Sequence, residues 1–335
     1  MYEKKFLQRT IHPWKILFIL ILNSVLFSCS SYSRKVEIKL TGASYCQPSK
    51  TALNRKIPSK EEIEKLKQNE EFNLLFSKKS IRLSIAYGFS NQLLEYSKLI
   101  QKANKSELDL AQKMELLYLE QNLRNQISLI SSEINAVASE LGCFIDRFNE
   151  IIQMLNDKEY DIIQSNTLYG IMTGAFFTII SGITIYDNPT TQAITILGGL
   201  VVGYYSYLAY KPEIVVYFKP KSTILKEIWN GPETSDNFSP AIWYLLNTKR
   251  NDLENEASFR ELLVQRWIKN NFLGAPGSEY HEKCINLFFK EGGASTIVNM
   301  THRREMVQEL KSLIQLLEHD VYSLRVDLSN LKEMK

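Results

Sequence analysis

Thiols, imidazoles and carboxylates are the side chains of this sequence that could do chemistry. His281 and Cys284 stand three residues apart on a predicted helix, which supplies half of a metal site, and no second pair accompanies them. The sequence contains no glycine-rich phosphate loop, no nucleophile elbow, no zinc-protease motif and no Cys-x-x-Cys. It therefore predicts no catalytic residue, no metal site and no non-covalent cofactor. An enzyme without a recognisable motif remains an alternative.

Cys29 is the cysteine with the most distinctive surroundings. A basic stretch from Lys4 to Lys15 precedes ILFILILNSVLF, whose roughly 12 apolar residues are too few for a bilayer span of about 20 but typical of a signal peptide. The following LFSC, Leu26 to Cys29, resembles the lipobox of bacterial lipoproteins, although Phe27 replaces a usual small residue. The resemblance implies cleavage after residue 28 and a diacylglycerol and an acyl chain, such as palmitate, on Cys29. The alternative is an ordinary signal peptide with a chance cysteine.

The charge distribution and the residue after Cys29 bear on location. The formal net charge of +3 equals that of the first 28 residues, so the remaining chain is nearly neutral. A neutral body lacks the cationic excess of a nucleic-acid-binding protein. Ser30, where an aspartate would retain an enteric lipoprotein in the inner membrane, favours the outer membrane. We expect a cell-envelope protein that faces the periplasm or the surface.

Three cysteines remain if Cys29 carries lipid, which allows one disulfide and one free thiol. Cys143 lies within a strong helical pattern and is expected to be a small buried side chain. This leaves Cys46 and Cys284 as the expected disulfide pair.

Two long heptad patterns dominate the helical regions. No proline and one glycine occur between Ser106 and Gln164, which we predict to be one helix. Apolar residues alternate in steps of three and four there, at Leu116, Leu119, Leu123, Ile127, Ile130, Ile134, Val137, Leu141, Phe144, Phe148, Ile151 and Leu155. The same spacing recurs in a predicted helix from Ile297 to Glu333, at Val307, Leu310, Ile314, Leu317, Val321, Leu324, Leu328 and Leu331.

These two helices are expected to pack on each other, antiparallel or in a bundle. The alternative is that the C-terminal helix pairs with another envelope protein or a second copy of the chain.

Shorter elements complete the prediction. Ser59 with Glu62 forms a capping box at the start of a helix to about Lys78, and a further helix covers about 81–103. Ser239 and Pro240 begin a helix that we extend to about Asn271, and Ser278 begins a short one. Two strands, 35–40 and 213–218, are expected to pair as a two-stranded element.

A hydrophobic hairpin lies at the centre of the chain. Its segments, Leu168–Tyr186 and Ala193–Tyr210, contain no Lys, Arg, Asp or Glu, and the turn between them carries one charge, on Asp187. Each segment is near the lower length limit for a membrane-spanning helix. The alternative is that the hairpin is buried within the protein.

The hairpin also has patterned polar and small residues. A membrane-interface belt at its base is predicted at Tyr169, Tyr204, Tyr205, Tyr207, Tyr210 and Lys211. A small inner face is predicted at Gly170, Gly174, Thr178, Ser181, Gly199 and Gly203. Lysines flank the hairpin rather than its turn, which opposes the positive-inside rule unless insertion occurs from the exported side.

Together these features predict a mainly α fold, an elongated bundle of long coiled-coil-like helices with a central hydrophobic helical hairpin and a minor two-stranded β element. The expected regions are a signal peptide (1–28), a lipidated tether (29–57), a long-helix region (58–165), the hairpin (166–210) and a C-terminal helical region (211–335). The architecture resembles the helical pore-forming toxins of the cytolysin A and haemolysin BL type.

Function is expected to be non-enzymatic, with membrane lipids as partners. The first hypothesis is a lipid-anchored envelope protein whose hairpin enters a bilayer and whose helices scaffold or tether. The alternative, which the toxin resemblance implies, is a membrane-active pore-forming protein.

Overall fold

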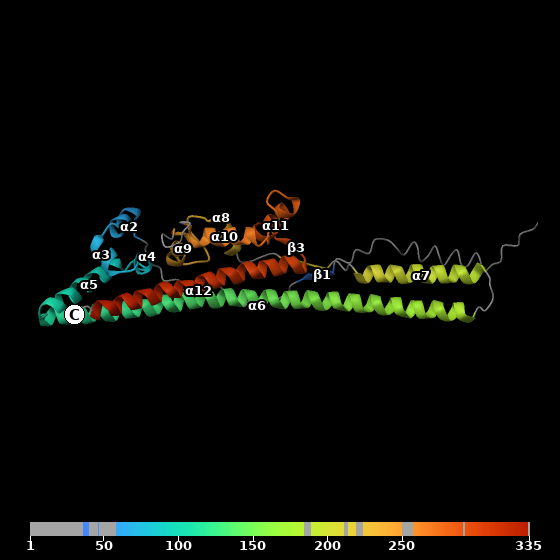
Figure 1. Cartoon of the computed structure of the whole chain (residues 1–335), viewed down its shortest axis with the longest axis horizontal. Coiled ribbons are helices and arrows are strands. Elements are labelled where there is room, and N and C mark those ends of the chain that lie inside the picture. The colour runs from blue at the N-terminus through green and yellow to red at the C-terminus, as the bar shows by residue number, and fades with distance from the viewer. Residues whose placement is uncertain are drawn as a thin grey trace, which may run out of the picture. The chain divides into compact units, whose positions relative to one another are not determined.

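The structure is a computed structural model that describes most of the chain from residue 36 onward. The described residues are 36–39, 46, 58–183, 189–210, 214–218, 224–249, 257–290 and 292–333. The predicted signal peptide, Cys29 and Lys211 lie outside them. The described residues are mainly helical, which confirms the predicted fold class (Figure 1).

The chain divides into two compact units. One contains residues 163–214, which bracket the predicted hairpin, together with residues 1–36. The larger unit contains residues 37–162 and 215–335. Helix α6 (Leu110–Ile183) runs without interruption through both segments, so the first half of the hairpin is not a separate helix.

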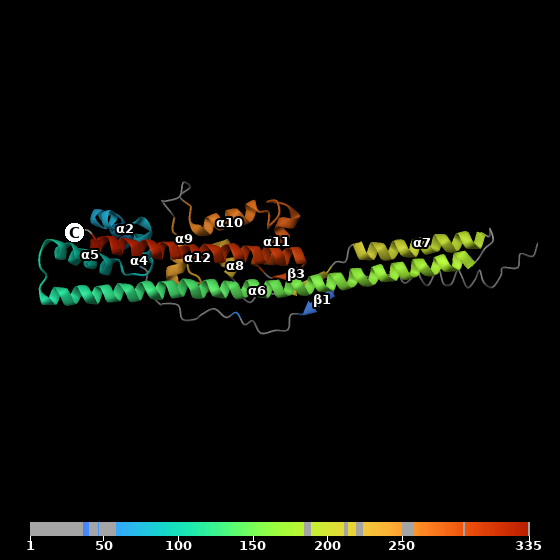
Figure 2. The same cartoon turned by 60° about the horizontal axis from the view of Figure 1, so that its bottom comes forward.

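The larger unit is built on α6 and α12 (Ile297–Glu333), which lie side by side in both views (Figures 1 and 2). Their antiparallel register is marked by three side-chain contacts: Lys332 Nζ to Glu120 Oε1 at 2.6 Å, Ser131 Oγ to Glu318 Oε1 at 2.9 Å, and Arg304 Nη1 to Asn149 Oδ1 at 3.2 Å. The predicted packing of the two heptad helices on each other is thereby confirmed.

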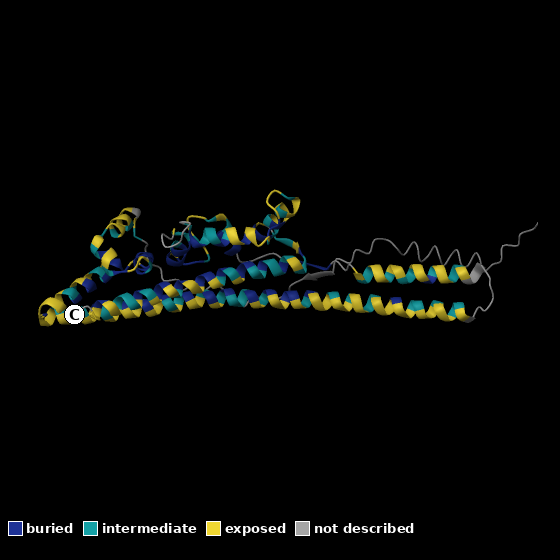
Figure 3. Cartoon of the chain, in the orientation of Figure 1, coloured by how far each residue is buried: buried dark blue, intermediate teal, exposed yellow. Residues whose placement is uncertain are grey.

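The apolar seam of α6 is buried over most of its length, with a local shift of one position (Figure 3). Ile134 is fully buried, but Val137 and Phe144 are only half-buried, and Ala138 and Ile145 take their places in the core. A straight helix drifts by about 20° per heptad relative to a 3.5-residue repeat. Ala138 and Ile145, each one position after the predicted seam residue, therefore face the core.

Shorter helices cover the long pair. They are α2 (Lys60–Lys67), α3 (Glu70–Leu75), α4 (Lys78–Ala86), α5 (Ser90–Lys105), α8 (Ile224–Asn230), α9 (Pro240–Asn247), α10 (Phe259–Lys269) and α11 (Glu279–Phe289). Helix α4 packs against α12 on one side and α9 on another, and every residue from Ser80 to Ala86 is buried. It is therefore the central short helix of the unit.

The predicted N-caps of two helices are correct, but the predicted lengths of these helices are not. The capping box of Ser59 and Glu62 is present, and Ser239 accepts a hydrogen bond from the Ile242 backbone. The predicted helix from 239 to 271 is wrong, because α9 ends at Asn247 and α10 starts at a second capping box, Ser258 with Glu261. A polar cap within a charged run starts a new helix there.

Three other boundaries differ from the prediction. Helix α6 begins at Leu110 rather than Ser106, because the Asp109 side chain caps it by accepting from the Gln112 backbone at 2.8 Å. The helix predicted from Ser59 to Lys78 is two helices, divided at Asn69, which caps the second. The helix predicted over 81–103 begins earlier, at residue 78, and is interrupted near Gly88, which has φ 70°.

A small sheet accompanies the helices. Its strand order is β1 (Val36–Lys39), β2 (Ile214–Phe218), β3 (Gly293–Ser295), and β2 pairs antiparallel with β3, Val216 opposite Ser295. The predicted pairing of β1 with β2 is confirmed. The third strand was not predicted, since Gly292 and Gly293 in the sequence indicate only a helix end.

The disulfide joins Cys46 to Cys143 and leaves Cys284 free and buried. The expected Cys46–Cys284 pair is therefore wrong. Cys143 lies on α6 only half-buried, so its side chain is accessible to the segment that carries Cys46. Helical periodicity places a cysteine on a face but does not show which other segment reaches that face.

We expect Cys143→Ser to destabilise the larger unit by about 2–5 kcal/mol, because the disulfide closes a loop of 97 residues in the unfolded chain. Urea unfolding of the oxidised protein measures the loss. Cys284→Ser is the control, because it leaves both cysteines of the disulfide in place. Peptide mapping under non-reducing conditions should find the Cys46–Cys143 peptide in this variant as in the wild type. A Cys46–Cys284 peptide in the wild type would contradict the assignment.

An ion pair between Arg82 on α4 and Asp320 on α12 lies in the core, with the two side chains 9% and 1% exposed. Asp320→Ala leaves the arginine charge unpaired, so we expect a loss of about 3–5 kcal/mol in urea unfolding. Glu61→Ala removes the partner of Lys65 in an exposed pair and should cost no more than about 1 kcal/mol. Equal effects would show that burial does not set the energy of the Arg82 pair.

Candidate functional site

The hairpin is formed by the last part of α6, from residue 163, and α7 (Pro189–Tyr210). The two helices run antiparallel and approach closely where glycines face them. A Cβ at Gly170 would lie 3.5 Å from Tyr205 Cβ, and one at Gly174 would lie 3.3 Å from Val202 Cγ2. A Cβ at Gly198 would lie 2.7 Å from Phe177 Cβ, which is shorter than a van der Waals contact. These three glycines make the inner seam of the hairpin.

Of the predicted small face, two glycines on the first helix line the seam, whereas Thr178 is exposed. Gly170 and Gly174 line the seam, whereas a Cβ at Gly199 or Gly203 would meet no atom within 4 Å. Gly199 and Gly203 lie outside the seam, and Gly198 was missed. Gly198 and Gly199 are adjacent and therefore lie on different faces of α7, and their spacing in the sequence does not show which of them faces the other helix. In the structure, Gly198 faces Phe177.

The hydroxyl groups of the hairpin bond to their own helix. Thr178 Oγ1 donates to the Gly174 carbonyl at 2.8 Å, and Ser181 Oγ donates to the Thr178 carbonyl at 2.9 Å. Thr173 and Ser206 donate in the same way to carbonyls four residues earlier. These bonds satisfy the hydroxyl protons without water, which lowers the cost of transferring the helices into an apolar medium.

Large apolar side chains cover the outside of the hairpin. The most exposed aliphatic, methionine and phenylalanine side chains are Leu168, Ile171, Met172, Phe176, Ile179, Ile196 and Leu200. Six of them are at least 60% exposed, with Leu200 at 65%. Figure 3 shows this exposure along both helices of the hairpin. Such a contiguous apolar surface is unusual in a soluble protein and marks an interaction site.

One helix in the described part of the chain is long and apolar enough to cross a membrane, Gln192–Tyr210, and 6% of it is buried. It corresponds to the second predicted segment. The first predicted segment continues from the larger unit as part of α6, and its described residues end at Ile183.

The predicted tyrosine belt gathers at the end of the hairpin away from its turn. The ring centroids of Tyr169 and Tyr205 lie 5.9 Å apart across the two helices, and Tyr204 and Tyr205 are also 5.9 Å apart. Tyr207 and Tyr210 are exposed. Their amphipathic rings at one level would suit a membrane interface.

His281 and Cys284 are the pair that the sequence indicates as half of a metal site. His281 Nδ1 lies 3.1 Å from the Leu273 carbonyl oxygen, and burial raises the pKa of the Cys284 thiol, so the thiol keeps its proton. No group of three metal-ligating side chains occurs in the part of the chain that the structure describes.

No protein-family model, no curated protein and no solved structure matches the chain.

We expect Gly198→Ala to loosen the hairpin, because its Cβ overlaps Phe177 and overpacking costs about 1–3 kcal/mol. Gly199→Ala is the matched control: its Cβ meets open space, and alanine favours a helix by about 1 kcal/mol. Limited proteolysis in detergent micelles should cleave the hairpin of the first variant faster than the wild type. Equal cleavage of the two variants would contradict the assigned seam.

Proposed function

We propose that the chain is a lipid-anchored, non-enzymatic bacterial envelope protein whose hairpin inserts into a bilayer and whose helical body serves as a scaffold or tether. The observation that carries the proposal is the exposed apolar surface of α7 and the end of α6. Keeping one large aliphatic side chain in water rather than in an apolar medium costs about 1.5–3 kcal/mol. For seven such side chains the cost is on the order of 10 kcal/mol.

The disulfide supports an exported location. Cys46–Cys143 is a bond of the kind that persists in oxidising compartments and is rare in the cytosol. The lipobox-like LFSC sequence points to the same compartment from an independent part of the chain. The hairpin would then enter the bilayer from the exported side, and its turn carries a single carboxylate, Asp187, across the membrane.

The sheet supports a common membrane level for anchor and hairpin. Seven peptide units separate Cys29 from Val36, the first residue of β1, and they reach at most about 25 Å. β2, the partner of β1, begins four residues after Tyr210 at the hairpin base, which is at most about 14 Å. The pairing of β1 with β2 therefore links the segment that follows Cys29 with the segment that follows the hairpin, which supports anchor and hairpin acting on the same membrane.

A pore-forming activity is the second candidate, and one feature favours it. Gly199 and Gly203 leave a small-residue strip on α7 outside the hairpin seam. Small residues four apart let membrane helices approach closely, so this strip could contact another copy of the hairpin.

Membrane insertion is tested with the chain carrying Cys29→Ala, which removes the lipid, in flotation with phospholipid vesicles. Leu200→Arg should weaken vesicle binding about 100-fold, because arginine at the centre of a membrane helix costs about 2.5–3.5 kcal/mol. Leu117→Arg, on the part of α6 in the larger unit, is the matched control, since the two leucines are 65% and 66% exposed.

Unchanged binding by both variants, or an equal loss in both, would overturn membrane insertion by the hairpin. The same chain can be added to vesicles that contain a dye. Dye release that Gly174→Arg abolishes would favour the pore-forming candidate. Flotation without dye release would favour the scaffold.

A further inference from the structure

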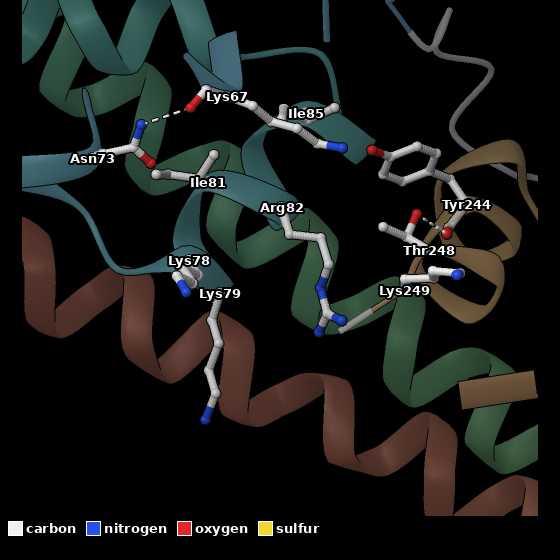
Figure 4. Close-up of a pocket in the computed structure, with 10 residues that line it drawn as sticks. All are labelled: Lys67, Asn73, Lys78, Lys79, Ile81, Arg82, Ile85, Tyr244, Thr248 and Lys249. Atoms are coloured by element: carbon white, nitrogen blue, oxygen red, sulfur yellow. Dashed lines mark hydrogen bonds between the residues drawn. The ribbon is translucent and has the colours of Figure 1, made fainter. Parts of the chain in front are cut away.

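A cavity of about 260 Å³ lies in the larger unit, between the α2–α3 connection, α4 and α9 (Figure 4). Four lysines and Arg82 line it, and its described lining residues include no carboxylate. Figure 4 shows Lys67 extending its ammonium end toward the ring hydroxyl of Tyr244, with Arg82 and Lys249 below. Positively charged and hydroxyl donors therefore come from three different elements of the fold.

Arg82 is the buried member of this set. Its guanidinium donates to Asp320 and lies 5.4 Å from the ring of Phe259, but its Nε is buried without a hydrogen-bond partner among the described residues. A buried donor without an acceptor is unfavourable and uncommon in proteins. An acceptor supplied by a ligand in the cavity would satisfy it.

Lys67 and Lys249 are the other charged donors of the cavity. Neither forms an ion pair with a residue that the structure describes, although Glu261 interacts electrostatically with Lys249. Burial raises the pKa of Tyr244, although hydrogen bonding and the charge of Arg82 act against it, so the phenol remains a donor at neutral pH. Asp320 neutralises Arg82. The residues that line the cavity therefore still carry an excess of positive charge and of hydrogen-bond donors.

We propose that this cavity binds a phosphate-bearing ligand, whose oxygens accept hydrogen bonds from Arg82, Lys67, Lys249 and Tyr244. A phosphate group offers strong acceptors in a tetrahedral arrangement, which suits donors arriving from different directions better than a planar carboxylate does. The cavity has room for the phosphate and a small substituent. A free phosphate compound and a phospholipid headgroup share this chemistry, and the proposal does not depend on membrane insertion by the hairpin.

The test is isothermal titration calorimetry with the full chain in a non-ionic detergent at low salt. Inorganic phosphate is titrated in one arm and dihexanoyl phosphatidylglycerol in the other. Saturable binding in the first arm identifies a soluble phosphate ligand, and binding in the second arm alone identifies a headgroup. We expect Lys67→Gln with Lys249→Gln to weaken binding at least tenfold and Tyr244→Phe to weaken it several-fold.

Lys98→Gln on α5 is the matched control, because Lys98 is exposed and does not line the cavity. It removes one positive charge and should leave the affinity unchanged. The exposed lysines can be replaced without disturbing the core, whereas Arg82 cannot. No binding in either arm, or an equal loss of affinity in the Lys98 control, would overturn the proposal.

Discussion

The structure depends on a change in how α6 distributes its apolar side chains along its length. In the larger unit, α6 has a buried apolar stripe on which Ile130, Ile134 and Leu141 are almost fully buried, although a few apolar side chains such as Leu117 lie outside it and are exposed. Beyond residue 163 apolar side chains surround the helix and include exposed Ile171 and Ile179. A one-sided stripe is stable in water, whereas an all-round apolar helix requires protein or lipid on every side. One continuous helix therefore carries two different distributions of apolar side chains.

The two units accordingly use different forces to pair helices. Burial of leucine and isoleucine seams removes apolar area from water and stabilises the pairing of α6 with α12. Within lipid that force is absent between helices, and close van der Waals packing replaces it. The packing of the hairpin is of the second kind, since Gly170, Gly174 and Gly198 let its two backbones approach closely. Phe177 lies against Gly198 on the facing helix.

Local sequence signals predicted the elements better than their contacts. The C-terminal helix, Ile297–Glu333, has the predicted bounds, and an unbroken heptad pattern from Val307 to Leu331 covers most of it. The capping box at Ser59 and the pairing of β1 with β2 were also predictable. The capping box depends only on residues close together in the sequence, and β1 and β2 were the two strands that alternating or β-branched residues indicated.

The errors concern the choice between faces and partners. Cys143, Gly198 and the cavity around Arg82 could not be found from sequence, since each depends on which distant segment packs against a given face. The motif searches that detect phosphate sites look for local loops, whereas these donors come from α4, α9 and the end of α2. The break between α9 and α10 did have a local signal, the capping box Ser258 with Glu261, within the charged run.

The small sheet joins segments that are far apart in the sequence. β1 follows the lipobox-like residues and β2 follows the hairpin, so the pairing of β1 with β2 links these two parts of the chain over short chain lengths. The Cys46–Cys143 disulfide adds a covalent link from Cys46, which follows β1, to α6. Under the proposed function, these hydrogen bonds and this covalent bond would connect the lipid anchor and the hairpin to the helical body.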